Sequence, residues 1–236
     1  MEKEDKKKLI DALLFNLFFL LIIWVIWWVE FEFGHRLTKW GTQPRTLRGA
    51  IGIITTPFLH GSLEHISGNT FSFVTLSSFL IFFYRSIAFK VLGLLYVCSG
   101  ILLWLIAFGG NHIGVSGIIY GLASFLFFSG ILRRDLKLLR VSLAVAFIYG
   151  SIVWGVLPID ASISWEGHLA GSVIGIVLSL VYRKKGPTPR KYQWELDEER
   201  EREEERLRLI EESAVDAQEI KWNEDPSKGW YQSDWT

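Results

Sequence analysis

Long blocks of apolar residues constrain the fold of this chain more than any other feature of its sequence. Half of the 236 residues are hydrophobic, with 17 Phe and 11 Trp among them. The apolar residues gather in six blocks, at 9–29, 66–84, 87–108, 115–132, 138–157 and 168–182. A helix needs about 20 apolar residues to cross the hydrocarbon of a membrane. The sequence therefore predicts an all-α membrane protein with six transmembrane helices.

The first block follows a charged start at residues 1–8. It is too long and too aromatic for a signal peptide, and no small-residue cleavage site follows it. We therefore expect it to be retained as the first transmembrane helix. Trp24, Trp27 and Trp28 are expected near its outer interface, where tryptophan is enriched.

Lysine and arginine residues in the connections predict the orientation. With a cytoplasmic N-terminus, the outer side receives four basic residues in the first loop, namely Arg36, Lys39, Arg45 and Arg48. The inner side receives many more, namely Lys3, Lys6, Lys7, Lys8, Arg85, Lys90, Arg133, Arg134, Lys137, Arg140, Arg183, Lys184 and Lys185. Because positive charge concentrates on the cytoplasmic side of membrane proteins, we expect both termini there.

The formal net charge is zero, but the two parts of the chain carry opposite charge. Residues 1–192 hold 19 basic and 10 acidic residues, whereas residues 193–236 hold 6 basic and 15 acidic residues. After the short N-terminus at 1–8, we expect a membrane domain at 9–185, with its outer loop at 30–64. A charged cytoplasmic tail is expected at 186–236. Opposite charges at helical spacing predict a helix in this tail from Tyr192 to about Ala217.

The acidic balance of the tail argues against nucleic acid as its partner. Residues 221–236 hold three tryptophans, which fit either a solvated tail or a segment at the membrane interface. The sequence leaves the partner of the tail open. Cys98 is the only cysteine and lies in an apolar block, so neither an intramolecular disulfide nor a cysteine-based metal site is expected.

A glycine-rich turn from Gly109 to Gly121 carries Ser116 between two glycines. If a helix begins at this serine, the free N–H groups and the dipole of that helix favour negative charge there. A nucleophile at this position would have part of an oxyanion site already in place. The alternative is that glycine and serine simply allow membrane helices to pack closely.

Two of the six blocks are short for membrane helices. Residues 116–132 and 168–182 number 17 and 15. At 1.5 Å per residue they span roughly 25 Å and 22 Å. A shortened helix that opens with a polar residue predicts a water-accessible cavity rather than contact with lipid.

Histidines segregate to one side of the predicted topology. The five are His35, His60, His65, His112 and His168, and all fall in outer loops or at outer helix ends. Scattered surface histidines would not be expected on one side alone, so this distribution points to a shared site there.

His168 begins the sixth block, and Gly171 and Gly175 follow it on one helical face. The fourth block offers a matching small surface, made of Gly117, Gly121 and Ser124. Packed side by side, these parallel helices would bring Ser116 and His168 to a similar depth. A neutral imidazole is the usual base for a serine nucleophile, although a capping role for His168 is the alternative.

His65 and Asn69 are four residues apart at the outer start of the second helix, and therefore share a face. Both side chains can donate hydrogen bonds and could help to bind an oxyanion. The alternative is that they form hydrogen bonds between helices. Tyr120 lies one turn after Ser116 and could pack against the ring of His168.

Taken together, these motifs resemble the rhomboid family of intramembrane serine proteases, over about residues 9–182. The shared pattern is Gly114-Val115-Ser116-Gly117 on the fourth helix, His168 with Gly171 and Gly175 on the sixth, and His65 with Asn69 on the second. The segment Pro57-Phe58-Leu59-His60-Gly61 precedes the last pair. Two departures stand out: the glycine spacing after His168 is less regular, and the Trp-Arg pair that some members carry in the first loop is missing.

The resemblance implies a six-helix rhomboid-like bundle with a catalytic dyad of Ser116 as nucleophile and His168 as general base. It implies an oxyanion hole made of the Ser116 backbone N–H, His65 and Asn69, with Tyr120 stacked on the histidine. No third carboxylate, no metal and no cofactor are expected. Gly114, Gly117, Gly171 and Gly175 would support the site by close packing.

The function that we expect is an intramembrane serine endopeptidase in the cell (inner) membrane, with transmembrane proteins as substrates and the lipid bilayer around it. The alternative is a non-catalytic binder or transporter of client proteins, in which the same polar residues line a pathway. Relatives of that kind usually lack one member of the dyad, and this chain keeps both.

Overall fold

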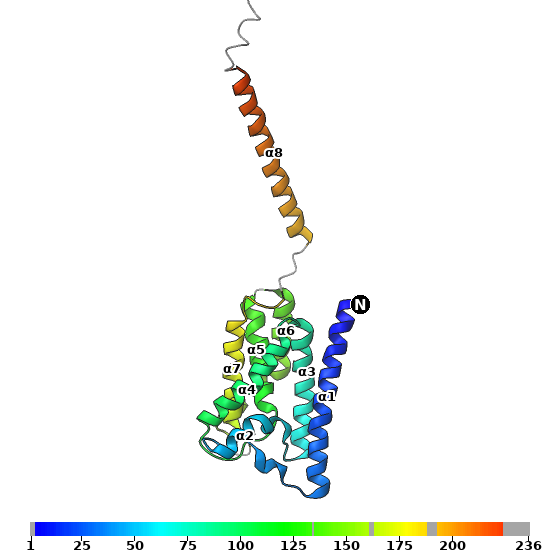
Figure 1. Cartoon of the computed structure of the whole chain (residues 1–236), viewed down its shortest axis with the longest axis vertical. Coiled ribbons are helices and arrows are strands. Elements are labelled where there is room, and N and C mark those ends of the chain that lie inside the picture. The colour runs from blue at the N-terminus through cyan, green and yellow to red at the C-terminus, as the bar shows by residue number, and fades with distance from the viewer. Residues whose placement is uncertain (1–2, 134, 161–162, 188–192, 224–236) are drawn as a thin grey trace, which may run out of the picture. The chain divides into compact units, whose positions relative to one another are not determined.

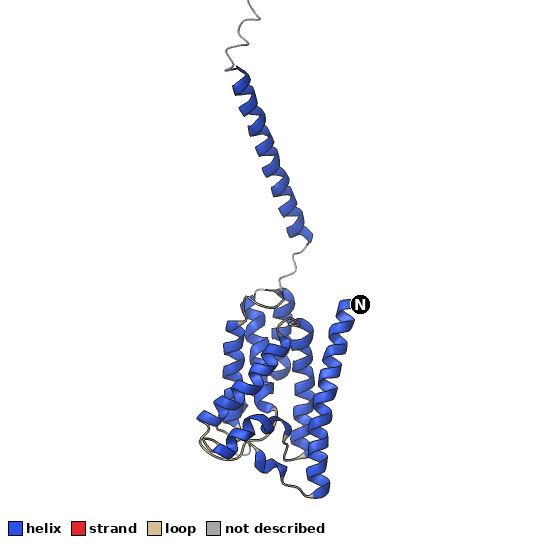
Figure 2. Ribbon diagram, in the orientation of Figure 1, coloured by secondary structure: helices blue, strands red, loops and turns tan. Residues whose placement is uncertain are grey.

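The computed structural model describes residues 3–133, 135–160, 163–187 and 193–223. The chain divides into two compact units, Met1–Thr188 and Pro189–Thr236. Within the described residues every regular element is a helix (Figure 2), and the one β contact is an isolated bridge between Thr42 and His112. The prediction of an all-α chain is confirmed for this part of the sequence.

Six helices make up most of the first unit (Figure 1). Their bounds are α1 Lys3–Phe33, α3 Leu63–Phe83, α4 Ala88–Ile106, α5 Ser116–Arg133, α6 Leu136–Tyr149 and α7 Trp165–Val181. Five spans in the described residues are long and apolar enough to cross a membrane, where α6 is counted together with the 3-10 helix η3 (Gly150–Val156) that continues it. The helix α7 is also apolar but shorter, with 17 residues.

The fifth predicted span is not one continuous helix. The helix α6 ends at Tyr149, and the seven residues of η3 follow as a tighter 3-10 turn. Gly150 stands at the change, and glycine is among the weakest helix formers. Apolar composition continues through both elements, which is why hydropathy alone predicted a single span.

The start of the last membrane helix was also predicted wrongly. It begins at Trp165, so His168 lies one turn inside α7 rather than at its first residue. The residues before His168 are polar, aromatic or glycine, and the apolar pattern therefore does not mark the first turn.

The helix α5 is the centre of the first unit. It contacts α3, α4, α6 and α7, whereas α1 packs against α3. Half of its membrane-length span is buried, a larger share than in the four other spans. Its core residues include Leu122, Phe125 and Leu126, all with no exposed surface. This position brings the N-terminal residue of α5, Ser116, among the ends of several helices.

Apolar side chains also cover the outside of this unit. Leu17, Phe18, Phe147 and Val181 are each more than half exposed. A surface of this kind is costly in water and suits contact with lipid.

The first loop folds into three short helices at the end of the bundle away from the N-terminus (Figure 1). These are η1 Leu37–Trp40, α2 Leu47–Thr55 and η2 Thr56–Phe58. Pro57 lies in η2 shortly after α2 ends at Thr55, since proline does not continue an α-helix. The β-bridge between Thr42 and His112, with both N–H···O distances at 2.9 Å, joins this loop to the segment before Ser116.

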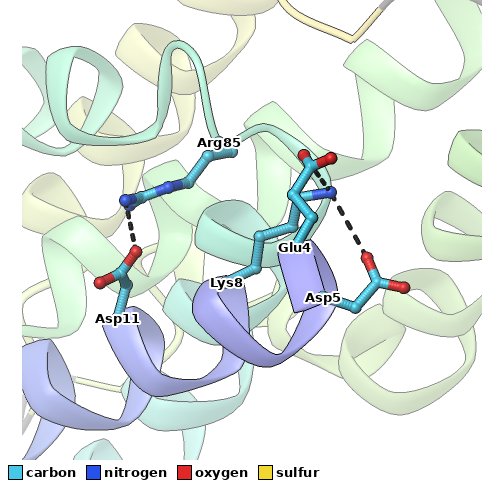
Figure 3. A network of polar contacts seen from close by, with 5 residues as sticks. All are labelled: Glu4, Asp5, Lys8, Asp11 and Arg85. Carbon is cyan, nitrogen blue, oxygen red and sulfur yellow. Dashed lines mark hydrogen bonds and ion pairs between the residues drawn. The ribbon is translucent and has the colours of Figure 1, made fainter. Parts of the chain in front are cut away.

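The other end of α1 is held by charged contacts, which Figure 3 shows. Arg85, in the turn between α3 and α4, forms an ion pair with Asp11 of α1. Lys8 lies 3.0 Å from Glu4 and 3.4 Å from Asp5 on the same helix. Deeper in the unit, the buried Asn16 binds Ser77 and Ser78 of α3, at 2.7 Å and 3.0 Å. The contacts of Arg85 and Asn16 fix α1 to α3 and to the turn that follows it.

The second unit contains one described helix, α8, at Gln193–Asn223. Its charged side chains pair along the helix, for example Arg202 with Glu198 and Arg206 with Glu203. Pairs of this kind stabilise an exposed helix by a few tenths of a kcal/mol each, about 0.2–0.5. Two of the three tryptophans in the tail fall in residues 224–236, which lie outside the described residues.

Candidate active site

Ser116 is the first residue of α5, as the sequence predicted. The preceding Gly114 has a φ of +104°, a conformation that L side chains rarely adopt. Its N–H donates to the carbonyl of Thr56 at 2.9 Å, which fastens the turn to η2. The serine therefore stands at the N-terminus of a central helix, where backbone N–H groups are free to bind an anion.

The structure brings Ser116 and His168 together. The Nε2 atom of His168 lies 2.9 Å from the Oγ of Ser116, within hydrogen-bond distance. The two residues are 52 positions apart in the chain. His168 is only 7% exposed, so this contact is sheltered from bulk water.

Close packing of glycines holds the two helices at this distance. A Cβ atom added to Gly171 would lie 1.8 Å from the carbonyl oxygen of Gly117, and one added to Gly175 would lie 2.2 Å from that of Gly121. Both contacts are to backbone atoms, which no rotamer change relieves. The predicted close approach of these small faces is confirmed, and we call this contact between α5 and α7 the glycine seam.

Two further groups fix the ring of His168. Tyr120 stacks on it, with ring centroids 4.0 Å apart and an interplanar angle of 6°. On the ring edge, Nδ1 lies 2.9 Å from the carbonyl oxygen of Gly155 in η3. A carbonyl can only accept, so Nδ1 carries the proton and the Nε2 lone pair of the neutral ring faces Ser116.

His65 and Asn69 lie against the serine turn. A Cβ atom on Gly114 would be 2.7 Å from the Nε2 of His65 and 3.4 Å from the Nδ2 of Asn69. Ser62 caps the N-terminus of α3 by accepting the N–H of His65 at 3.1 Å, which sets where the helix begins. Only glycine at position 114 leaves room for both side chains beside Ser116.

Known proteins are similar to the part of the chain that holds these residues. A family model described as the Rhomboid domain matches residues 48–185. The uncharacterized protein Mb1372 of Mycobacterium bovis is 30% identical over 168 residues, which cover 67% of this chain and 70% of that protein. The uncharacterized protein ML1171 of Mycobacterium leprae is 28% identical over 169 residues, covering 67% of this chain and 66% of that protein.

The chain belongs to the rhomboid family. Together with its apolar helices, this membership makes it an integral membrane protein. The matched residues contain the serine turn, the histidine of α7 and the His65–Asn69 pair.

The sequence placed His60 of this rhomboid on the side of the expected shared site but indicated no partner for it. It is 2% exposed, and its Nε2 lies 3.1 Å from the Nδ2 of Asn69. Burial, and then the nearby His65, lower the pKa of His60 from 6.5 to about 4. The neutral ring accepts a hydrogen bond from the Asn69 amide, which leaves the second amide hydrogen free.

The remaining histidines do not reach the Ser116–His168 pair. His112 places Nδ1 2.6 Å from the hydroxyl of Ser164, just before α7, and Nε2 2.9 Å from the carbonyl of Gly109. His35 is exposed after the end of α1, beside Phe33. The expected shared site therefore holds His60, His65 and His168, with His112 connecting the loops around it.

A small cavity of about 30 Å³ opens beside Ser116. Polar groups among its lining residues include Thr56, Ser99 and Ser164. A volume of this size admits a water molecule when polar partners are present. In the described part of the chain no group of three or more His, Cys, Asp or Glu side chains is arranged to hold a metal ion.

Proposed function

We propose that this rhomboid is an intramembrane serine endopeptidase that cleaves transmembrane segments of membrane proteins. The observation that carries the proposal is the 2.9 Å contact between Ser116 Oγ and His168 Nε2 at the N-terminus of α5. Ser and His at hydrogen-bond distance, with the histidine oriented by a further group, is the arrangement that activates a serine.

In the first step Ser116 Oγ attacks the carbonyl carbon of the scissile peptide bond, and its proton moves to His168 Nε2. The oxygen of the tetrahedral intermediate becomes negative. Donors for it are the backbone N–H of Ser116 and the side chains of His65 and Asn69. The C–N bond then breaks as His168 returns the proton to the leaving amine, which yields an acyl-enzyme on Ser116.

In the second step a water molecule attacks the acyl carbon. His168 takes a proton from that water, and the ester bond to Oγ breaks as His168 passes the proton to Oγ. The products are a free carboxylate on the substrate and a regenerated Ser116. The cavity beside Ser116 supports this step, because it leaves space for a water molecule next to the nucleophile.

We further propose that all six long helices cross the cell membrane, with both termini in the cytoplasm. The excess of Lys and Arg in the connections at the inner ends supports this orientation. The site then opens toward the outer side, and the substrates are single-pass proteins whose helix unwinds locally at the site.

Labelling of the purified protein with a fluorescent fluorophosphonate tests the proposal, because this probe reacts with activated serines. We expect the wild type to label and to cleave a transmembrane substrate, and both activities to vanish in Ser116→Ala and His168→Ala. Ser67→Ala, at an exposed serine between His65 and Asn69, is the matched control and should label normally. A folded wild type that neither labels nor cleaves any transmembrane substrate would identify a non-catalytic binder.

A further inference from the structure

The edge of the His168 ring that faces away from Ser116 is bound by a backbone atom. Its Nδ1 lies 2.9 Å from the carbonyl oxygen of Gly155, in η3, 13 residues earlier in the chain. Resting on the proposed function above, we propose that the Gly155 carbonyl is the positioning group of the catalytic base. It takes the place that a carboxylate side chain occupies in a three-residue serine protease site.

The chemistry of the carbonyl gives it this role. A carbonyl oxygen has no proton to donate, so the hydrogen bond holds the proton on Nδ1. The neutral ring then presents the lone pair of Nε2 to Ser116, which is the form that accepts the serine proton. Without this acceptor the other tautomer, with its proton on Nε2, becomes populated and cannot serve as the base.

The approach of η3 to the ring requires glycine at position 155. A Cβ atom there would lie 2.0 Å from the Oη of Tyr120, 3.0 Å from its Cζ and 3.3 Å from the Nδ1 of His168. These are the atoms of the stacked Tyr120–His168 pair. A larger residue would therefore lift the backbone of η3 from the ring and lengthen the hydrogen bond.

One other residue of η3, Ile152, packs against the core of the unit, and the remaining side chains hold the segment only lightly. Val153 and Trp154 are 56% and 65% exposed, so their side chains face outward while the Gly155 carbonyl faces the site. After η3 the chain is closed by a weak turn, from the Leu157 N–H to the Trp154 carbonyl at 3.2 Å. Displacement of η3 would thus change the orientation of the base before it changed the core of the unit.

Gly155→Ala tests the proposal, with Gly150→Ala as its matched control. Both glycines belong to η3, but a Cβ on Gly150 meets no atom within 4 Å, and its φ of −58° suits alanine. We expect Gly155→Ala to lower kcat for a transmembrane substrate about 100-fold, within the range for a general base. KM should change less than about threefold, since the substrate is bound by other groups. Gly150→Ala should retain wild-type kcat.

A direct readout is the tautomer of His168, measured by two-bond ¹H–¹⁵N correlation on protein labelled with ¹⁵N-histidine. The His168 signals are identified by their loss in His168→Ala. The proposal requires a proton on Nδ1 in the wild type and a mixture of tautomers in Gly155→Ala. A proton on Nε2 in the wild type, or an unchanged tautomer in the variant, would overturn it.

A second substitution guards against a simple folding defect. Tyr120→Phe removes the atom that lies closest to the added Cβ. In the Tyr120→Phe background, Gly155→Ala should then lower kcat less than about 30-fold, compared with roughly 100-fold in the wild-type background. An equal loss in both backgrounds contradicts the steric part of the argument. If the wild type is active and Gly155→Ala equals Gly150→Ala, this inference fails while the proposed protease stands.

Discussion

Two elements hold His168, and they do so in different ways. The glycine seam between α5 and α7 fixes its distance from Ser116 through backbone atoms that touch one another, as at Gly171 and Gly117. The 3-10 helix η3 fixes only the ring orientation, through one hydrogen bond from Nδ1 to Gly155. The seam is a backbone contact within the bundle, whereas η3 is partly exposed and packs against the core through Ile152.

A catalytic base must lie at the right distance from the nucleophile and must carry its proton on the right nitrogen, and here a different element meets each requirement. Distance between the reacting atoms depends on helix packing and therefore on the stability of the whole unit. The protonation site depends on a local backbone contact, and it can be lost while the unit stays folded. Substitutions in the two elements should consequently separate stability from turnover.

The largest effect is expected for Gly171→Ala, which breaks the seam. Its Cβ would lie 1.8 Å from the backbone oxygen of Gly117, so the helices must move apart. We expect a loss of stability of about 1–3 kcal/mol, or more, together with nearly complete loss of cleavage. Thermal unfolding in detergent micelles and a cleavage assay measure the two effects. Gly93→Ala, at a helical glycine of α4 with open space around it, should show neither.

Asn69→Ala should have the next largest effect, on turnover. It removes a donor beside the serine turn, and loss of one oxyanion donor typically lowers kcat about 10²–10³-fold. KM should change little, because the charge on the oxygen develops only in the transition state. The measurement is steady-state cleavage by the folded fraction. Unchanged turnover in that fraction would mean that Asn69 only connects the helices, which was the alternative at the outset.

The sequence predicted the close packing of α5 against α7 well. Gly171 and Gly175 share a face at helical spacing, and Ser116 follows a glycine turn, so both could be placed from residue type and period. Family membership, which the motifs also predicted, is confirmed. Helix starts were less accurate, as Trp165 shows, because the first turn of α7 carries no apolar pattern.

The contact between η3 and His168 could not be predicted in the same way. The atom that contacts His168 there is a backbone carbonyl, and every residue has one, so Gly155 carried no chemical signal. The break after Tyr149 was hidden because apolar residues continue through it. The role of His60 was missed for a related reason, since its partner Asn69 is nine residues away across a helix start.

A third prediction concerns the loss of stability at low pH. The pKa of His60 is about 4 in the folded chain and near 6.5 when the chain is unfolded, so the unfolded state takes up this proton first. The contribution of neutral His60 to the free energy of unfolding is therefore complete above pH 6.5, and it is lost as the pH falls from 6.5 to 4. The loss amounts to about 3 kcal/mol at most.

Chemical unfolding at a series of pH values measures this slope. His60→Gln is the matched variant, because its amide oxygen can still accept from Asn69 while its side chain does not titrate. Its stability should fall less steeply than that of the wild type over the same window. Equal slopes would assign the acid sensitivity to other groups.

The smallest effect should be that of Gly155→Ala on stability. Its contrast with Gly171→Ala tests most directly whether η3 and the glycine seam act separately. The atoms nearest to its added Cβ are the Oη and Cζ of Tyr120, at the far end of a side chain, whereas Gly171→Ala meets a backbone carbonyl. Tyr120 can shift, and η3 can lift toward the surface, without opening the seam. We expect the free energy of unfolding to fall by about 1 kcal/mol or less, which is small for a buried clash. If Gly155→Ala instead unfolds as readily as Gly171→Ala, η3 belongs to the same cooperative core as the seam, and distance and orientation of the base are not separable in this protein.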